Sequence, residues 1–151
     1  MIPPPTIRPL ADAEMATLRA ALEEADLPTQ DLDGGCKRFF AAVGADGVPL
    51  GYAGLEVYGS DALLRSVVVP RSRQRNGIGR ALVRGTLDAA ARDGVRTIYL
   101  LTMTAEGFFA NLDFRRTERT AVPAPIAKTR EFTTLCPATA VAMARTLPVT
   151  R

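Results

Sequence analysis

The chain has 151 residues, of which 47% are hydrophobic and 23% are charged, and its formal net charge is +3. These values are typical of one globular domain that buries a core without disulfides or metal ions. The chain contains no histidine, which excludes histidine general bases, histidine-containing triads and histidine metal ligands. Its two cysteines, Cys36 and Cys136, are too far apart along the chain to form a zinc motif.

The sequence shows no basic-plus-apolar signal segment and no apolar run of membrane length. We therefore expect a single domain over residues 1–151, a cytoplasmic location, no membrane partner and no bound metal. A net charge of +3 does not require a nucleic-acid partner, and we expect none. The basic excess would still help to attract a polyanionic small molecule.

The first half of the chain predicts one helix followed by three strands. The helix begins at Asp12, a favourable N-cap residue, and ends at Leu27-Pro28. Residues 37–43 and 49–58 are predicted to form a β-hairpin around an Asp-Gly turn. Residues 63–69 are apolar enough for a central strand. The helix carries one apolar stripe, formed by Met15, Leu18, Leu22 and Ala25.

The second half alternates helices and strands. Residues 77–91 are predicted to form a helix, residues 97–101 a short apolar strand, and residues 105–112 a short helix. We further expect a strand over 114–122 and a final helix over 138–147. This order predicts an α+β or α/β fold, in which one sheet carries helices on both faces.

A basic loop joins the strand 63–69 to the helix that begins near Gly77 and Gly79. Glycines at a helix start leave the first amides uncovered, and the helix dipole favours an anion there. Glycines alone would also fit an ordinary turn, but the buried strand and the nearby cations favour a pyrophosphate site. These cations are Arg71, Arg73, Arg75 and Arg80.

Two common phosphate motifs do not fit this loop. It lacks the Gly-Lys-Ser/Thr of a P-loop. It also lacks the third glycine of the dinucleotide fingerprint, and it is longer than the tight turn of that motif.

The segment Gln74-Arg75-Asn76-Gly77-Ile78-Gly79 resembles the Q/R-x-x-G-x-G/A motif of the GNAT superfamily of N-acetyltransferases. The resemblance continues on both sides and covers about half the chain in the right order. Residues 64–70 resemble the fourth strand of that family, and residues 99–102 the fifth. Residues 105–114 are similar to the helix that usually ends in Leu-Gly-Phe.

A narrower resemblance is to the small GNAT proteins described as arsenic-resistance N-acetyltransferases. It rests on residues 54–59, on the Leu-Arg-Ser-Val strand, on residues 100–105 and on Glu131-Phe132 with Leu135-Cys136-Pro137. The same strand and the Phe-Phe helix are also similar to amino-acid acetyltransferases of the glutamate type.

The resemblance implies a mixed, mostly antiparallel sheet of six to seven strands, with helices on both faces and a splayed fourth and fifth strand. It also implies acetyl-CoA as co-substrate, with its pantetheine paired to the main chain of Val67 and Val69. The Val68 N–H would lie near the thioester oxygen, and Phe109 would line the cofactor site. The pyrophosphate would meet the backbone of Gln74, Arg75, Asn76, Gly77, Ile78, Gly79 and Arg80.

The sequence departs from the family at two catalytic positions. The usual acid at the start of the fourth strand is Leu63, so Glu56 on the neighbouring strand becomes the candidate base; the alternative is an ordinary solvent-facing glutamate. The usual tyrosine of the short helix is Phe109, so Thr102, Thr104 or water would bond the departing sulfur. Cys136 is a possible nucleophile, although a buried packing role is the better explanation.

Arg65 is the candidate for acceptor binding, because a guanidinium on a central strand needs a partner such as an acceptor carboxylate or arsonate. A salt bridge with Glu56 or another acid is equally compatible. Ser66 would add one hydrogen bond, and Arg130 with the loop 29–33 would close the pocket. The phenylalanines expected in the core are Phe39, Phe40, Phe108 and Phe132.

The sequence therefore favours an enzyme that acetylates a small amine with an acidic group, amino-acid-like and possibly arsenic-containing. Two alternatives remain: a non-catalytic acyl-CoA-binding module, and an acetyltransferase for protein N-termini or lysines. A homodimer is expected only by analogy with the family.

Overall fold

The computed structural model describes residues 5–32, 37–70, 77–129, 132–133 and 139–148. Within these ranges seven strands form one sheet in the order β1-β2-β3-β4-β5-β7-β6. All pairs of neighbours are antiparallel except β4 and β5, which are parallel. The strands are β1 (Thr6–Pro9), β2 (Lys37–Val43), β3 (Pro49–Tyr58), β4 (Asp61–Val68), β5 (Thr97–Thr102), β6 (Arg115–Arg116) and β7 (Val141–Thr146).

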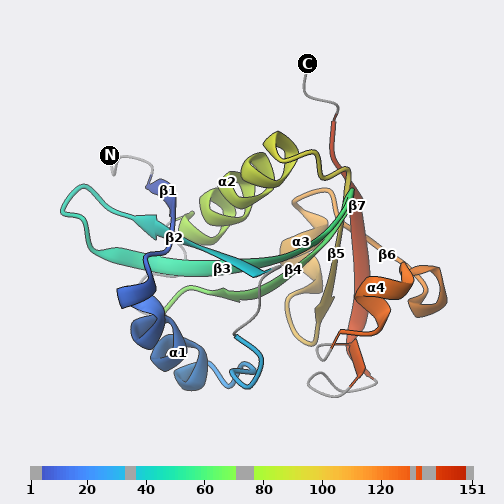
Figure 1. The fold of residues 1–151 in the computed structure, drawn as a ribbon, viewed down its shortest axis with the longest axis horizontal. Helices are drawn as coiled ribbons and strands as arrows, with labels where there is room; N and C mark the ends of the chain where they lie inside the picture. The colour runs from blue at the N-terminus through green and yellow to red at the C-terminus, as the bar shows by residue number, and fades with distance from the viewer. Residues whose placement is uncertain (1–4, 33–36, 71–76, 130–131, 134–138, 149–151) are drawn as a thin grey trace.

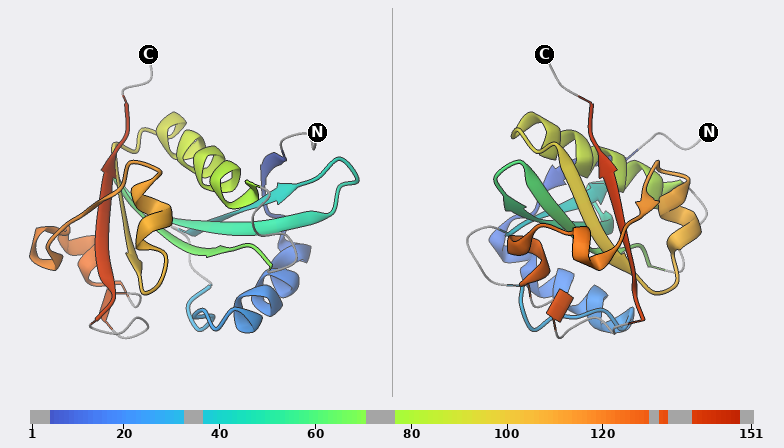
Figure 2. Two further views of the ribbon diagram at one scale, coloured as in Figure 1. Left: turned by 180° about the vertical axis from the view of Figure 1, so that it is seen from behind. Right: turned by 90° about the vertical axis from the view of Figure 1, so that its right-hand side faces the viewer.

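The helices lie on both faces of this sheet, as Figures 1 and 2 show. One face is covered by α2 (Ile78–Arg92) and α3 (Glu106–Ala110), and the other by α1 (Met15–Glu24) and α4 (Ala124–Ala127). Two 3-10 turns, η1 (Asp12–Glu14) and η3 (Arg119–Ala121), precede α1 and α4. The predicted mixed sheet with helices on both faces is confirmed.

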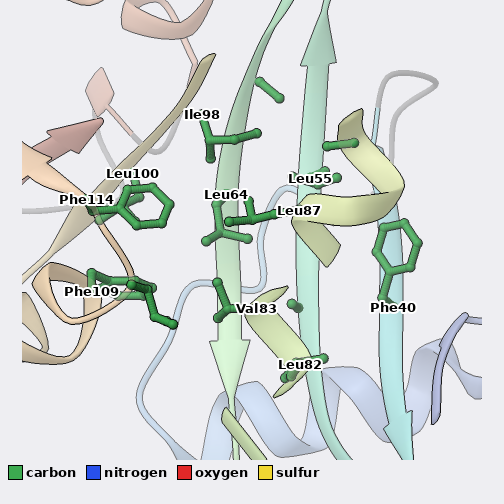
Figure 3. Packing of buried hydrophobic residues seen from close by; sticks show 14 of the residues in the cluster. Phe40, Leu55, Leu64, Leu82, Val83, Leu87, Ile98, Leu100, Phe109 and Phe114 are labelled. Atoms are coloured by element: carbon green, nitrogen blue, oxygen red, sulfur yellow. The ribbon is translucent and has the colours of Figure 1, made fainter. Parts of the chain in front are cut away.

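The largest apolar core lies between the sheet and the α2–α3 face. Leu82, Val83 and Leu87 of α2 pack with apolar residues of β3, β4 and β5. Figure 3 shows Leu64 of β4 beside these helix residues, with Phe109 near one edge of the same core. Smaller cores hold α1 against β2 and β3, and α4 against β4, β5 and β7. The sheet is therefore buried on both faces in its centre.

The hairpin β2–β3 has the bounds that the sequence predicted, 37–43 and 49–58. The predicted strand 63–69, helix 77–91 and strand 97–101 agree with β4, α2 and β5 to within two residues at either end. The turn residue Gly47 has φ of 82°, as an Asp-Gly hairpin turn requires.

The predicted final helix over 138–147 is wrong, because the described part of that segment contains the strand β7. Ala, Met and Leu gave this segment a helical composition. In the fold, however, β7 pairs with β5 on one side and β6 on the other. Its successive residues Ala142 and Met143 enter cores on opposite faces of the sheet, which only an extended chain allows.

The remaining differences are at short elements. The predicted strand 114–122 contains only the two-residue β6, followed by η3. The edge strand β1 was not predicted, and it pairs with β2 although it ends in a proline. The single turn α4 was also not predicted, although Pro125 lies in its first turn, where proline costs no hydrogen bond.

A close approach of β1 to α2 provides a test of this packing. A Cβ atom on Gly85 would overlap Ile7 Cγ1 and would lie 2.7 Å from Ile7 Cβ. We expect Gly85→Ala to lower the free energy of unfolding by about 1–3 kcal/mol, because overpacking outweighs the gain in helix propensity. Chemical denaturation measures the change.

Gly107→Ala is the matched control, because a Cβ built there meets no atom within 4 Å. We expect this variant to be neutral or more stable by up to about 1 kcal/mol. Ile7→Ala combined with Gly85→Ala should recover part of the loss. Equal stability of the two single glycine variants would contradict the described β1–α2 contact.

Candidate active site

The parallel strands β4 and β5 separate halfway along their length. Their register pairs are Asp61 with Thr97, Ala62 with Ile98 and Leu63 with Tyr99. From Leu64 onwards β4 has no register partner on β5, while β5 continues to pair with β7 up to Thr102. Figure 1 shows the two strands meeting at one end and diverging towards the other. The predicted splay is confirmed, and it opens a gap in the middle of the sheet.

A cavity of about 640 Å³ fills this gap. Its walls are residues 64–69 of β4 and the segment after it, residues 100–105 of β5 and the following turn, and Phe108 and Phe109 of α3. Gly79 of α2 lies at one side, and Ala25, Leu27 and Pro28, which follow α1, lie at another. Phe108 and Met103 are 36% and 56% exposed. Apolar side chains left open beside a cavity indicate a surface that binds a ligand.

A bulge in β4 shapes the cavity wall. Tyr52 pairs with Val68, and Gly54 pairs with Arg65, so one residue of β3 lies opposite two residues of β4, Ser66 and Val67. Ser66 has φ of 55°, a left-handed conformation that is uncommon for serine. A bulge removes local ladder hydrogen bonds and bends the strand. Strain of this kind concentrates at functional sites, and here it lies in the part of β4 that has separated from β5.

The N-terminus of α2 lies beside the cavity, and none of the described residues caps it with a side chain. Gly77, its N-cap residue, has φ of 74°, which glycine adopts without steric cost. The first helical hydrogen bond runs from Ala81 N–H to Gly77 O over 3.1 Å. The amides of Ile78, Gly79 and Arg80 therefore precede the helical ladder and point outward from the helix start. This arrangement suits an anion.

Part of the predicted anion site lies outside the described residues. This is true of Gln74, Arg75 and Asn76, and also of Arg71 and Arg73. Within the described part of the helix start, Arg80 is exposed and Ile78 is buried in the core.

The short helix α3 forms the opposite wall. Phe109 is buried, and its ring makes edge contacts with Phe108 and Phe114, at centroid distances of 5.0 and 5.6 Å. The expectation that Phe108 is a core residue is wrong, because its ring lies at the cavity within reach of Gly79. A Cβ on Gly79 would be 3.3 Å from Phe108 Cζ. Thr102 Oγ1 accepts the Ala105 N–H over 3.0 Å and thereby fixes the turn into α3.

A buried cluster of charged groups lies on the α1 side of the cavity. Arg65 Nη1 and Nη2 donate to Asp31 Oδ2 and Oδ1, at 2.5 and 2.6 Å. Arg65 Nη1 also donates to Glu56 Oε2 at 2.7 Å, and Arg65 Nε donates to Ser66 Oγ at 3.1 Å. Glu56 Oε1 accepts a hydrogen bond from the Tyr58 hydroxyl at 2.7 Å. Arg65 thus connects two carboxylates to the bulge residue.

The charged cluster is almost completely removed from solvent. Asp31, Glu56 and Arg65 are 7%, 2% and 4% exposed. Burial raises the pKa of Asp31, but the hydrogen bond and charge of Arg65, with the charge of Lys37, outweigh it, so this pKa lies below its usual value. Ion pairs elsewhere in the described ranges are more exposed, such as Arg8 with Glu14 and Arg116 with Glu106. The pairs of Arg65 differ from these because they are buried. Removing one partner from a buried ion pair leaves an uncompensated charge and lowers the stability of the fold.

The cavity collects many of the residues that the sequence predicted for the site, and several lie elsewhere. One alternative described Glu56 as an ordinary solvent-facing glutamate. This alternative is wrong, because Glu56 is buried behind Arg65. Arg65 makes the salt bridge that the other alternative described. Cys36, Cys136 and Arg130 lie outside the described residues. The predicted residues that line the cavity are Arg65, Ser66, Val67, Val68, Val69, Gly79, Thr102, Thr104 and Phe109.

Two polar residues of this region were not assigned from the sequence. Asp31 lies in the loop expected to close the pocket, but nothing in the pattern indicated that it would pair with Arg65, which is 34 residues away along the chain. Tyr58 lies two residues after Glu56 on β3, a spacing that brings both side chains to one face of the sheet. The contact between Tyr58 and Glu56 could therefore have been predicted from this two-residue spacing.

Within the described ranges, no three side chains of the His, Cys, Asp or Glu types gather closely enough to hold a metal ion. The helices that the structure describes also include none with the length and apolarity needed to cross a lipid bilayer.

The sequence matches one family model, described as the acetyltransferase (GNAT) family, over residues 7–114. No curated protein matches the chain.

Several solved structures share the fold. Rv2747 from Mycobacterium tuberculosis, in complex with CoA and NLQ, is 22% identical with a TM-score of 0.78, over 95% of this chain and 100% of that one. N-acetylglutamate synthase from Neisseria gonorrhoeae, complexed with coenzyme A and L-arginine, is 16% identical with a TM-score of 0.77, over 95% of this chain and 33% of that one. The ribosomal-protein-S18-alanine N-acetyltransferase from Escherichia coli is 19% identical with a TM-score of 0.73, over 97% and 96%.

The buried Asp31–Arg65 pair predicts a pH-dependent stability difference. We expect Asp31→Asn to lower the free energy of unfolding at pH 7 by about 1.5–3 kcal/mol, because a hydrogen-bonded charge is lost while Glu56 still balances Arg65. The folded-state pKa of Asp31 lies below its ordinary value of 3.8. The stabilisation is therefore complete above that value and is lost as the pH falls below it.

Urea denaturation of both proteins between about pH 7 and pH 2 measures this difference. The gap between wild type and Asp31→Asn should stay constant down to about pH 5 and then shrink in more acid solution. A gap that is the same at every pH would contradict a charged Asp31 in the folded protein.

Proposed function

The chain belongs to the acetyltransferase (GNAT) family, and we propose that it transfers the acetyl group of acetyl-CoA to the amine of a small molecule. The single observation that carries this proposal is the cavity between the splayed strands β4 and β5, which lies beside the glycine-containing N-terminus of α2. A slot lined mostly by apolar groups, next to an anion site, matches a ligand with an uncharged arm and a pyrophosphate. The coenzyme A in two of the similar structures supports this assignment.

We place the coenzyme along β4, with its pyrophosphate at the start of α2. In this arrangement the main chains of Val67 and Val69 pair with the pantetheine amides. The amides of Ile78, Gly79 and Arg80 bind the pyrophosphate, and the motif residues Gln74, Arg75 and Asn76 complete the turn around it. Gly77 and Gly79 are needed because a side chain at either position would stand between the anion and the amides.

Phe108 and Phe109 form the apolar side of the slot. Phe108 lies close to Gly79, on the side of the cavity nearest the helix start. We propose that the exposed ring of Phe108 packs against the pantetheine arm. The buried ring of Phe109 supports Phe108 through their edge contact. Burial of the arm between these rings and the valines of β4 would supply hydrophobic binding energy.

Acetyl transfer forms a bond from the amine nitrogen to the acetyl carbon and breaks the bond from that carbon to sulfur. The Val68 N–H, just after the bulge, is our candidate to bond the carbonyl oxygen as negative charge develops on it. The Thr102 hydroxyl is our candidate to donate to the departing thiolate, since Phe109 has no hydroxyl. Much of the acceleration would come from holding the amine and the thioester together.

The proton that the amine loses must reach a base. Glu56 remains our candidate. Its carboxylate is buried behind Arg65 and does not line the cavity, so a water molecule would have to carry the proton. The Tyr58 hydroxyl, which donates to Glu56 Oε1, holds that carboxylate in a fixed position.

The sequence predicted an acidic group on the acceptor because Arg65 needed a negatively charged partner. In the structure this guanidinium already binds two carboxylates and the Ser66 hydroxyl. We therefore propose a small amine without assigning an acidic group of the acceptor to Arg65. Amino acids and arsenic-containing amino acids remain on the list of acceptors to be tested, together with peptides.

The first experiment measures release of free CoA from acetyl-CoA across such a panel, with calorimetry of coenzyme A binding. We expect turnover with at least one small amine and measurable heat on adding the coenzyme. Gly79→Glu should abolish coenzyme binding, because a carboxylate at the helix start repels the pyrophosphate and meets Phe108.

Arg84→Glu, farther along α2 and exposed, is the control and should bind coenzyme A nearly as the wild type does. Binding without turnover of any acceptor would instead favour the non-catalytic module. Undiminished affinity in Gly79→Glu would rule out the proposed pyrophosphate site.

The second experiment tests Glu56 with the acceptor that the panel identifies. We expect Glu56→Gln to lower kcat by about 10²-fold or more, the contribution typical of a general base. Coenzyme affinity should be unchanged. Glu24→Gln, an exposed residue of α1, should leave kcat unchanged. A wild-type kcat in Glu56→Gln would exclude this carboxylate as the base.

A further inference from the structure

Arg65 is the point at which three separate segments meet on the α1 side of the cavity. Its guanidinium binds Asp31 from the connection after α1, Glu56 from β3 and Ser66 from the bulge of β4. The contact with Asp31 is bidentate, the strongest geometry available to an arginine and a carboxylate. The Arg65 side chain itself is only 1% exposed. Its donor atoms are thus directed at protein groups and not at the open cavity.

The connection that carries Asp31 also forms part of the cavity wall. Leu27 and Pro28 line the cavity, and Leu32 is buried in the core beneath α1. The Leu27 amide donates to Leu22 O over 2.9 Å at the end of α1. This wall is therefore tied to the rest of the molecule by the end of α1 and by Asp31, with Leu32 anchoring it in the core.

We propose that Asp31 is a positioning residue, which uses Arg65 to hold residues 25–32 as the acceptor wall of the cleft. This inference rests on the proposed function, because it assigns the second substrate to this side of the cavity. A consequence is that the acceptor meets Leu27 and Pro28 here, and not the guanidinium of Arg65. Asp31 occupies the edge of Arg65 that an acceptor carboxylate would need.

The first test needs no substrate. Hydrogen exchange of the Leu27 amide is compared between wild type, Asp31→Asn and Asp26→Asn. Asp26 lies in the same connection, is exposed and has φ of 58°, which asparagine also tolerates. In Asp31→Asn we expect the acceleration at Leu27 to exceed by about tenfold the acceleration at the amides of α2, which report the general loss of stability, and we expect no change at Leu27 in Asp26→Asn. Unchanged exchange at Leu27 in Asp31→Asn would overturn the proposal.

The second test is kinetic and uses a matched pair of acceptors, an amino acid accepted by the enzyme and its carboxamide. In Asp31→Asn we expect the KM for both acceptors to rise about tenfold, because the wall is no longer held. We expect kcat to change less than about twofold and coenzyme A affinity to stay constant, since the β4 groups and α2 are untouched. A purely structural loss would instead reduce coenzyme binding and kcat together.

The opposite kinetic result would refute the proposal. If Asp31→Asn lowers the KM for the amino acid but not for the carboxamide, Asp31 competes with the acceptor carboxylate for Arg65. Leu27→Ala provides a further check, because it removes a wall side chain directly. Its effect on acceptor kcat/KM should be non-additive with that of Asp31→Asn, and simple additivity would count against a shared wall.

The two proposals can fail separately. If no acceptor is turned over and coenzyme A does not bind, the proposed function is wrong, whatever the exchange of Leu27. If turnover and coenzyme binding are found but Leu27 exchanges equally fast in Asp31→Asn and wild type, the function stands and the role of Asp31 is wrong.

Discussion

The separation of β4 from β5 is the constraint on which the rest of the site depends. A parallel pair normally continues for the full length of both strands, because each lost register pair leaves amide and carbonyl groups without partners. Here the pairing stops at Leu63 and Tyr99. The two strands stay in the sheet because each keeps its outer neighbour, β3 for β4 and β7 for β5. The opened inner edges then present main-chain groups to the cavity, where a ligand with its own amides can pair with them.

The bulge at Ser66 and the charged cluster behind it act together on this opening. The bulge changes the direction of β4 after Arg65. Arg65, the residue before it, is fixed by two carboxylates and by the Ser66 hydroxyl. A buried guanidinium with several charge-assisted hydrogen bonds resists rotation of its own backbone segment. The strained serine and the neighbouring ion pairs are therefore parts of one support for the cavity wall.

Much of this fold could be predicted from the sequence, because its signals are local. The Asp-Gly turn predicted the β2–β3 hairpin, and the glycine motif predicted the start of α2. The segment of β7 could not be recognised, because its strand character comes from pairing with β5 and β6 and not from its composition. Long-range pairing of this kind overrides local propensity.

The site shows the same division between local and distant information. Residues 65–69 and Gly79 were assigned from a contiguous motif, and they do line the cavity. Glu56 was named as a possible partner of Arg65 and is one, but Asp31 was not named, since nothing local distinguishes it from the other carboxylates of the chain. The role of Phe108 was missed because the adjacent residues Phe108 and Phe109 look alike in sequence, although Phe109 is buried and Phe108 is exposed at the cavity.

The strand order has a consequence for how the protein is assembled. Strand β5 makes six register pairs with β7 and only three with β4. Strand β7 lies some forty residues later in the chain and is inserted between β5 and β6. During synthesis, β5, which forms one wall of the ligand slot, therefore cannot complete its pairing until β7 has been made. Such non-local pairing slows folding, and the wall of the cleft that β5 forms is complete only once β7 has paired with it.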